Sequence, residues 1–313
     1  MKSLSLIIPV FNEEESLPKL FLAIKELNKE IERLGIECQY VFSDNSSTDN
    51  SQMLIRKFMS STDLQITFIE LHRNYGYQAS LLNAMSIIDT DAVVLFQSDL
   101  QDPPELILRM IKDVIDNPNL QSIAGQIIKR SENKVDQLGR RLFYFCLSLV
   151  SDSVAYHNVQ DFYLIKRRIY KSLVNSPSRF QFLRSRIASE FGFDKLISYE
   201  RQKRASGVTK FNFPSKMDLA LDGLLANSTK FRRFLVISSV GVSLLSVVSG
   251  FSLTFAYFLG WRSGAIGWVS LILIQLLILA LASGLISLLL EYVGRIYQLL
   301  VQPVNVTFEL YKK

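Results

Sequence analysis

Apolar and polar residues alternate with two different spacings over roughly the first 125 residues. Short, nearly continuous apolar runs predict strands at residues 3–10, 39–43, 65–71 and 92–96. Between them, apolar residues recur at helical spacing and predict helices at residues 13–34, 49–59, 78–88 and 104–116. Strands that alternate with helices indicate an α/β fold, in which helices flank a mostly parallel sheet on both faces.

The pattern changes beyond this region. Residues 126–229 are less regular, although residues 138–150 and 217–225 have the apolar density of helices. Each of these two segments is compatible with a place in a soluble core or in a membrane interface. Residues 234–261 and 263–290 then contain no Asp, Glu, Lys or Arg. Because about 20 apolar residues suffice to cross the hydrocarbon core as a helix, they predict a transmembrane hairpin.

Charge divides the chain in the same way. Of the net charge of +6, residues 230–313 carry +5, so the pI of 9.2 reflects the hairpin flanks and not a nucleic-acid surface. Basic residues flank both outer ends of the hairpin, and the connecting loop carries only Arg262. By the positive-inside rule, the N-terminal domain and the C-terminal tail face the cytoplasm. We therefore expect a cytoplasmic domain (residues 1–215), a juxtamembrane amphipathic segment (216–233) and a hairpin with its tail (234–313, spans about 234–260 and 265–290).

Acidic residues follow the predicted strand at 92–96. The segment FQSDLQDPPE places Asp99 and Asp102 at the strand end, where α/β enzymes commonly bind their ligands. Paired carboxylates at such a place suit Mg²⁺ or Mn²⁺ on a diphosphate, because these ions prefer oxygen ligands. The alternative is that the two residues only cap the helix that begins near Pro103.

Three other predicted strands are also followed by acidic or amide-rich segments. These segments are PVFNE (residues 9–13), SDNSSTD (43–49) and RNYG (73–76). No glycine-rich dinucleotide or P-loop motif occurs, so phosphates are not expected to be held in a glycine cradle. An acidic, amide-rich edge instead suits a base, a ribose and a metal-bound diphosphate.

The motifs IIPVFNEEE, DNSSTDNS, RNYGYQASLLNAM and SDLQDPPELI, in this order, resemble family-two glycosyltransferases of GT-A fold. Together with DFYL, RASGVTKF, the two spans and EYVGRIY, they resemble the polyprenyl-phosphate glycosyltransferases of that family. The resemblance covers nearly the whole chain. It implies a GT-A-like sheet and the inverting transfer of a sugar, such as glucose from UDP-glucose or a related UDP-sugar, to undecaprenyl phosphate in a bacterial inner membrane. Two partners, the lipid bilayer and a second copy of the chain, are also compatible with the hairpin.

The resemblance also implies roles for particular residues. The nucleotide-binding residues are Pro9, Phe11, Glu13 and Asp44. The metal, Mg²⁺ or Mn²⁺, is expected on Asp99, with Gln101 and Asp102 as its other candidate ligands. The catalytic residues are Asp161, Asp99, Arg204 and Lys210. The candidates for the acceptor phosphate are Arg130, Lys230, Arg232 and Arg233, although the last three equally suit anionic lipid.

Three positions depart from the family pattern. Gln97 stands where relatives usually have the first Asp of Asp-x-Asp, and Tyr77 stands where Lys is frequent. In addition, Ser43–Ser46 replaces a common Asp-Asp-Gly-Ser. Gln97 offers a carbonyl oxygen without charge, which leaves metal dependence and sugar identity open. It also leaves open an alternative function, a non-catalytic or altered relative that binds nucleotide or lipid.

Overall fold

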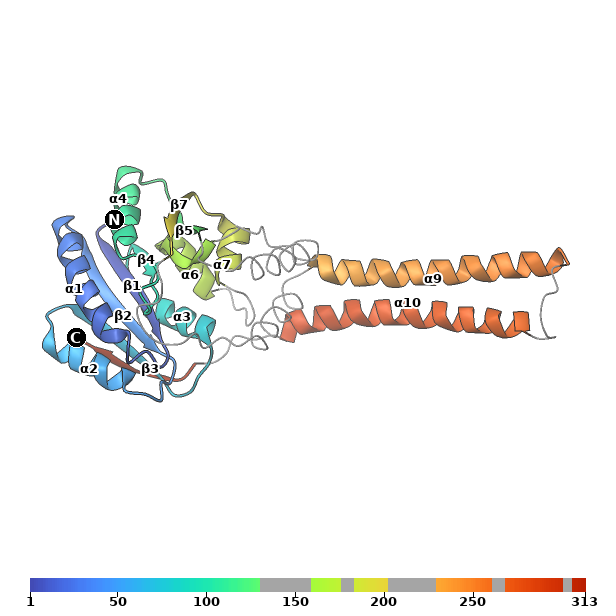
Figure 1. Ribbon diagram of the computed structural model, residues 1–313, viewed down its shortest axis with the longest axis horizontal. Coiled ribbons are helices and arrows are strands. Elements are labelled where there is room, and N and C mark those ends of the chain that lie inside the picture. The colour runs from blue at the N-terminus through green and yellow to red at the C-terminus, as the bar shows by residue number, and fades with distance from the viewer. Residues whose placement is uncertain (130–158, 176–182, 202–228, 261–267, 301–305) are drawn as a thin grey trace. The chain divides into compact units, whose positions relative to one another are not determined.

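The computed structural model describes residues 1–129, 159–175, 183–201, 229–260, 268–300 and 306–313 (Figure 1). The chain divides into two compact units. The first contains residues 1–137, 153–216 and 302–313, and the second contains residues 138–152 and 217–301.

The first unit is built on one sheet, which has eight strands within the described residues. The strands are β1 (Ser3–Val10), β2 (Glu37–Asp44), β3 (Gln65–Leu71), β4 (Ala92–Leu95), β5 (Ser122–Lys129), β6 (Val159–Lys166), β7 (Lys195–Glu200) and β8 (Phe308–Lys312). Their order is β7-β5-β6-β4-β1-β2-β3-β8. Four neighbouring pairs are parallel, whereas β6 runs antiparallel to β4 and β5, and β8 runs antiparallel to β3. The expectation of a mostly parallel α/β sheet is confirmed.

Helices cover both faces of this sheet (Figure 1). One core holds the apolar sides of α1 (Leu17–Arg33), α2 (Ser51–Ser61) and α4 (Glu105–Asp116). The other core holds those of α3 (Tyr77–Ser86), α6 (Arg167–Asn175), α7 (Leu183–Arg186) and the π-helical turn Ile187–Phe191. Strand β1 shows why both faces are covered, because Leu6 and Ile8 enter the first core and Ile7 enters the second.

The predicted elements of residues 1–116 are all present, two of the strands with the predicted bounds. The middle of the chain holds three strands, β5, β6 and β7, that its irregular apolar pattern did not predict. In β5 the pattern is broken by Gly125, where a Cβ atom would lie 2.8 Å from Tyr199 and 2.9 Å from Phe162. Close packing at that point therefore requires glycine, and a glycine in the middle of the segment interrupts the apolar pattern by which a strand is predicted. The predicted helices at 138–150 and 217–225 lie outside the described residues.

The C-terminal tail is part of the first unit. Residues 308–312, which we expected only as a tail of the hairpin, form β8 at the edge of the sheet. Tyr311 stacks on Phe68 with 5.9 Å between ring centroids, and the guanidinium of Arg56 lies over the Tyr311 ring. Strand β8 thus covers the edge of β3, which would otherwise expose a row of backbone hydrogen-bonding groups.

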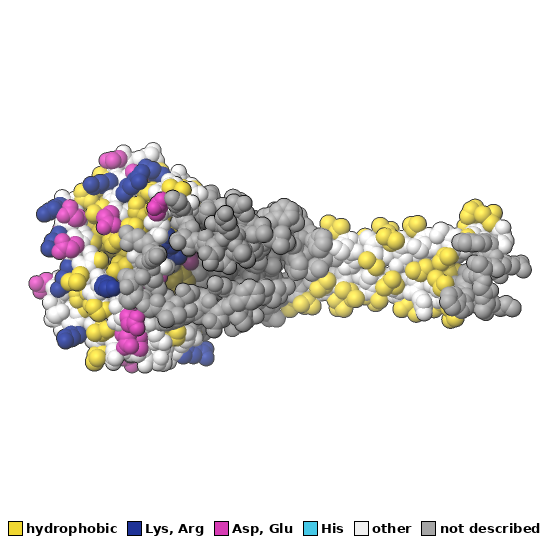
Figure 2. Space-filling model, in the orientation of Figure 1, with side chains coloured by type: hydrophobic (Ala, Val, Ile, Leu, Met, Phe, Trp, Pro, Cys, Tyr) yellow, Lys and Arg dark blue, Asp and Glu magenta, His cyan; other side chains and the backbone are white. Residues whose placement is uncertain are grey.

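The second unit contains two long helices, α9 (Thr229–Phe258) and α10 (Trp268–Leu300). Both are long and apolar enough to cross a membrane, over Val236–Ala256 and Ser270–Gly294. They pack on each other through small polar side chains, and the Ser243 hydroxyl lies 2.6 Å from that of Ser283. Large apolar side chains such as Phe251 (74% exposed) and Leu245 (71%) point outward, and Figure 2 shows hydrophobic surface along both helices. Such extensive exposed apolar surface suits lipid and not water.

Candidate active site

The topology brings the predicted ligand-binding segments to one edge of the sheet. Strands β1, β2, β3 and β4 are parallel, and the chain passes from β3 to the other side of β1 before it forms β4. The carboxyl ends of β1 and β4 therefore flank a topological switch point, the usual ligand site of open α/β sheets. We call this edge the carboxyl rim; it consists of the loops after β1, β2, β3 and β4 at residues 11–16, 45–50, 72–76 and 96–104.

Backbone strain is concentrated in these loops. Among the described residues other than glycine, positive φ angles occur at Asn12 (54°), Ser46 (63°) and Leu100 (55°), each in a different rim loop. Asn tolerates this conformation, but Leu and Ser adopt it at a cost of about 1–2 kcal/mol. Strained residues persist only where their surroundings hold them, and they cluster at binding and catalytic sites.

Hydrogen bonds join the first three loops to one another. The Asn12 side-chain oxygen accepts a 2.7 Å bond from the Thr48 backbone N–H, which links the loops after β1 and β2. Asn45 links the loops after β2 and β3: its Oδ1 accepts from the Tyr75 N–H at 2.9 Å, and its Nδ2 donates to Asn74 at 2.7 Å. The amide-rich composition of these segments thus builds a fixed rim.

The predicted nucleotide-binding residues lie in this rim or in the last residues of the strands that lead to it. Phe11 is 36% exposed, and Glu13 accepts a 2.6 Å hydrogen bond from the Ser16 hydroxyl. Asp44 is buried at the end of β2, where its carboxylate accepts bonds from the Ser47 N–H at 3.0 Å and from Gln52 at 2.8 Å. Pro9 pairs in register with Ser43 near the ends of β1 and β2. The structure brings the four residues together, and their roles stay predictions.

The loop after β4 presents Asp99. Its Oδ1 accepts a 3.1 Å bond from the Gln101 backbone N–H, and the residue is 8% exposed. Asp102, by contrast, is fully buried. The Tyr199 hydroxyl donates to its Oδ1, and the Arg201 Nε lies 3.4 Å from the same oxygen. Arg201 also donates from Nη2 to the Gln97 Oε1 at 3.0 Å.

Burial raises the pKa of Asp102, while the nearby charge of Arg201 and the Tyr199 hydrogen bond lower it. The charges of Asp99 and Asp161 raise the Asp102 pKa further, so the three carboxylates lie close enough to interact.

Asp161 reaches the same edge from β6. Leu95 of β4 pairs with Tyr163 of the antiparallel strand β6, so the register continued by two residues sets Asp161 level with Gln97. Its Oδ1 lies 3.9 Å from the Arg184 Nη1, a long ion pair. The Tyr77 hydroxyl is buried in the same place, beside Gln97, and no hydrogen bond of good geometry reaches it from the described residues. Burial first, and the Asp161 charge second, raise the pKa of the Tyr77 phenol.

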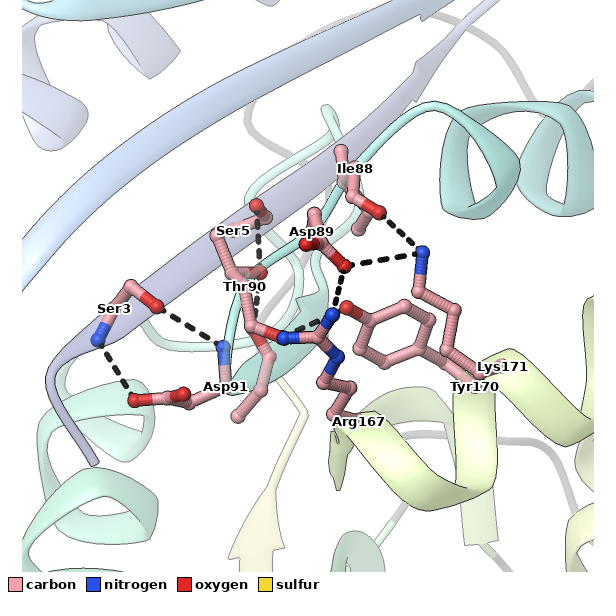
Figure 3. A network of polar contacts seen from close by, with 10 residues as sticks. Ser3, Ser5, Ile88, Asp89, Thr90, Asp91, Arg167, Tyr170 and Lys171 are labelled. Atoms are coloured by element: carbon pink, nitrogen blue, oxygen red, sulfur yellow. Dashed lines mark hydrogen bonds and ion pairs between the residues drawn. The ribbon is translucent and has the colours of Figure 1, made fainter.

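At the opposite ends of the same strands, the acidic side chains Asp89 and Asp91 are paired with donors (Figure 3). There the Asp91 Oδ2 accepts backbone N–H bonds from Lys2 at 2.6 Å and Ser3 at 3.2 Å. Asp89 pairs with Arg167 at 2.5 Å and with Lys171 at 3.3 Å. The hydrogen bonds to Asp91, led by that from Lys2, lower its pKa. We call this edge the amino edge, and both of these aspartates, Asp89 and Asp91, are matched by donors.

The remaining predicted site residues are only partly within the structure. Arg130, Arg204 and Lys210 lie outside the described residues. Lys230, Arg232 and Arg233 lie in the first turns of α9, and their side chains are not among those described.

Sequence reasoning missed Arg184, Tyr199 and Arg201 as parts of the site. One signal in the sequence could have indicated Tyr199 and Arg201. Apolar and polar residues alternate along β7, so that Ile197 and Tyr199 are buried, and the strand ends one residue before Arg201.

A divalent metal would find few ligands here. The described residues contain no group of three or more His, Cys, Asp and Glu side chains placed to hold a metal ion. Asp99 and Gln101 offer a carboxylate and an amide oxygen, which is a hard but incomplete ligand set. It fits a cation that also takes oxygens from the diphosphate of a bound donor.

Comparison with solved structures supports the fold. The chain is similar to mannosyl-3-phosphoglycerate synthase from Rubrobacter xylanophilus, with a TM-score of 0.50 and 14% identity, over 71% of each chain. At this identity the likeness concerns the fold alone, a GT-A-like sheet with flanking helices.

Sequence comparison identifies the family. The chain is 28% identical over 299 residues to a bactoprenol glucosyl transferase of Shigella phage SfX, which covers 94% of both proteins. It is also 28% identical over 294 residues to the uncharacterized glycosyltransferase YkcC of Bacillus subtilis, over 94% of this chain and 89% of the relative. Residues 5–190, more than half of the chain, match the family described as Glycosyl transferase family 2. The protein therefore belongs to glycosyl transferase family 2.

Proposed function

We propose that the protein transfers a sugar from a nucleotide-sugar, UDP-glucose or a related UDP-sugar, to the phosphate of a membrane polyprenol. The observation that carries the proposal is a combination within one chain: a carboxyl rim with Asp99 at the switch point, and two apolar helices whose exposed surface suits lipid. The likeness to a bactoprenol glucosyl transferase extends through both parts. The product would be a lipid-linked monosaccharide for the cell surface.

The donor would lie across the carboxyl rim. Pro9, Phe11, Glu13 and Asp44 would hold the nucleotide. Breaking the bond between sugar and diphosphate leaves negative charge on the leaving nucleoside diphosphate. Mg²⁺ or Mn²⁺ held by Asp99 and Gln101 would supply positive charge at that diphosphate. Asp102 was predicted to join these ligands, but its full burial and its pairing with Arg201 favour a role in shaping the loop.

The acceptor needs little activation. A polyprenyl phosphate is already an anion at neutral pH, so its oxygen can attack the anomeric carbon without a strong general base. A single displacement of this kind inverts the anomeric configuration. Asp161 lies beside the loop after β4 and would orient the sugar and the acceptor, with Arg184 in a long ion pair with its carboxylate. Arg204 and Lys210 would neutralise donor or acceptor phosphates, and Arg130 with the basic residues of α9 would meet the acceptor.

The hairpin would bring the site to its acceptor. A polyprenyl phosphate keeps its tail in the bilayer and its phosphate at the surface, so an anchored enzyme meets it by lateral diffusion. Strand β8 follows the second apolar helix and pairs with β3. Both ends of the hairpin therefore connect to the same folded unit. Because that unit lies on one side of the membrane, the chain between the two ends has to cross the membrane an even number of times. Under the positive-inside rule, the catalytic domain would lie on the cytoplasmic face of a bacterial inner membrane.

A donor screen tests the proposal. The full chain in nanodiscs that contain undecaprenyl phosphate is incubated with a panel of nucleotide-sugars, with Mg²⁺, with Mn²⁺ or with EDTA, and the lipid fraction is analysed by mass spectrometry. We expect one donor to yield a lipid-linked monosaccharide and Asp99→Asn to reduce the yield at least ~100-fold. Failure to consume any donor in a broad panel contradicts the proposal.

Gln97 supports a second candidate, a relative that binds nucleotide or lipid without turnover. An uncharged amide at this position weakens the metal site compared with a carboxylate. In the same screen this candidate predicts saturable donor binding by calorimetry, unchanged by added Mg²⁺ or Mn²⁺ and accompanied by no sugar-lipid.

A further inference from the structure

Arg201 contacts both ends of the loop at residues 97–102, which we call the donor loop. Its Nη2 donates to the Gln97 Oε1 at 3.0 Å, and its Nε lies 3.4 Å from the Asp102 Oδ1. The residue follows directly after β7, whose last residue, Glu200, pairs with Lys129 of β5. Its side chain is only 20% exposed, and contacts of this kind are held more firmly than those of a solvated arginine.

The loop between these two contacts needs to be held. Leu100 has a φ of 55°, a conformation that is costly for a branched side chain, and Asp99 lies immediately before it. Within the loop, the Gln101 N–H donates a hydrogen bond to the Asp99 Oδ1. A strained loop keeps one shape only when its surroundings hold it, and the Arg201 guanidinium contributes a hydrogen bond to Gln97 at one end and an ion pair with Asp102 at the other.

The charges of the loop are consistent with this role. Asp102 is fully buried, and its Oδ2 has no hydrogen-bond partner among the described residues. The ionised form of such a buried carboxyl is stabilised by a nearby cation, and the Arg201 Nε lies 3.4 Å from the Asp102 Oδ1. Gln97 accepts a hydrogen bond from the same guanidinium without competing for its charge. A carboxylate at position 97 would instead divide that charge between two acids.

We propose that Arg201 is a positioning residue of the donor site, which holds Gln97 and Asp102 together and thereby fixes the loop that presents Asp99. In this arrangement the Gln97 amide binds Arg201 and helps to hold the loop, at the position where relatives usually have the first Asp of Asp-x-Asp. The structural claim stands independently of the reaction, whereas its consequence for the donor rests on the proposed function.

Hydrogen exchange tests the structural claim without any ligand. The full chain in nanodiscs is compared with Arg201→Gln and Gln97→Leu by mass spectrometry of peptides that cover residues 96–103. We expect both variants to exchange about 10-fold faster in this loop, and the double variant to exchange no faster than the faster single variant. Unchanged exchange in the single variants, or additive effects in the double variant, would overturn the proposal.

Two further variants separate positioning from charge and from general destabilisation. Arg201→Lys keeps the cation near Asp102 but cannot bind both ends, so the loop should still exchange faster than in the wild type. Wild-type exchange in Arg201→Lys would show that charge alone suffices and would overturn the two-point contact. Arg167→Gln is the matched control, because it removes an arginine–aspartate pair at the amino edge and should leave residues 96–103 unchanged.

Donor binding provides the second measurement. With UDP-glucose as the probe, Arg201→Gln and Arg201→Lys should weaken binding about 10-fold, and Arg167→Gln should leave it unchanged. Wild-type affinity in a variant whose loop exchanges faster would contradict the link between the loop and the donor. If the wild type binds and consumes no nucleotide-sugar, the proposed function fails, while the exchange experiment still decides the role of Arg201.

Discussion

The two edges of the central sheet are built on different principles. At the amino edge, Asp91 accepts two backbone hydrogen bonds and Asp89 pairs with two cations, in backbone without left-handed residues other than glycine among those described. At the carboxyl rim, the loops contain strained residues, and Asp102 is buried with one oxygen unpartnered within the described part of the chain. The same strands run through both edges. The carboxyl rim therefore contains features that lower the stability of the fold, whereas the amino edge contains none among its described residues. Such features are typical of ligand-binding sites.

Removing an acid at each edge should give the largest contrast. Asp161→Asn should lower the rate of sugar transfer at least ~100-fold, because the carboxylate lies beside the donor loop. Asp89→Asn, at the amino edge, should leave transfer per folded molecule unchanged. The measurement is the rate of lipid-linked sugar formation, normalised to folded protein. Similar losses in both variants would remove the functional distinction between the edges.

Backbone strain provides the next test. Ser46 has a φ of 63°, and a β-branched residue is disfavoured there more strongly than serine. Ser46→Val should therefore lower the free energy of unfolding by about 1–2 kcal/mol, whereas Ser46→Gly should change it by less than ~0.5 kcal/mol. Denaturant unfolding of the two variants measures the difference. Equal stability of the Val and Gly variants would show that the rim loop is not held in the left-handed conformation.

The two edges should respond to acid with opposite signs. The pKa of Asp91 is lowered below 3.8 by the backbone N–H of Lys2, so the ionised group stabilises the fold, and this stability is lost as pH falls through its folded pKa. Burial raises the pKa of Asp102 above 3.8, so the fold loses stability as pH rises through that raised value.

Melting temperatures measured between pH 3 and 7 check these signs. Asp91→Asn should make the decrease in melting temperature from pH 4 to pH 3 smaller by about 2–4 °C. Asp102→Asn should make the decrease in melting temperature between pH 4 and pH 7 smaller by a similar amount. Changes of the same sign in both variants would contradict the assignment of the two environments.

The smallest effect is expected at the surface of the amino edge. Arg167 and Asp89 are 53% and 64% exposed, so solvent screens most of their attraction. Arg167→Gln should lower the free energy of unfolding by less than about 1 kcal/mol, and sugar transfer should not change. Denaturant titration with a parallel transfer assay measures both. A large loss of stability would mean that the amino edge depends on this single pair.

Sequence reasoning predicted the elements that have strong periodicity. Strand β1 and helix α1 have uninterrupted apolar patterns, and the convergence of four polar segments at one edge follows from parallel strand topology. The hairpin was visible as two uncharged stretches. What escaped prediction depends on contacts between distant segments: Gly125 interrupts β5 because of Tyr199 and Phe162, and β8 pairs with a strand more than 230 residues away.

The same limit applies to the site. Asp99 and Asp161 could be named from their motifs, but nothing local in the sequence sets Arg201 against Gln97, 104 positions apart. The departure at Gln97 was visible in the sequence as a missing charge. In the structure, Gln97 accepts a hydrogen bond from Arg201, which follows β7, a strand that was not predicted.

The most direct test of the account is to locate the donor on the protein. The full chain in nanodiscs is photolabelled with 5-azido-UDP-glucose, with excess unlabelled UDP-glucose as the competitor, and the adducts are mapped by peptide mass spectrometry. The account predicts adducts suppressed by the competitor in the rim loops at residues 11–16, 45–50, 72–76 and 96–104. Competed adducts at the amino edge, around residues 88–91 and 166–171, would contradict it.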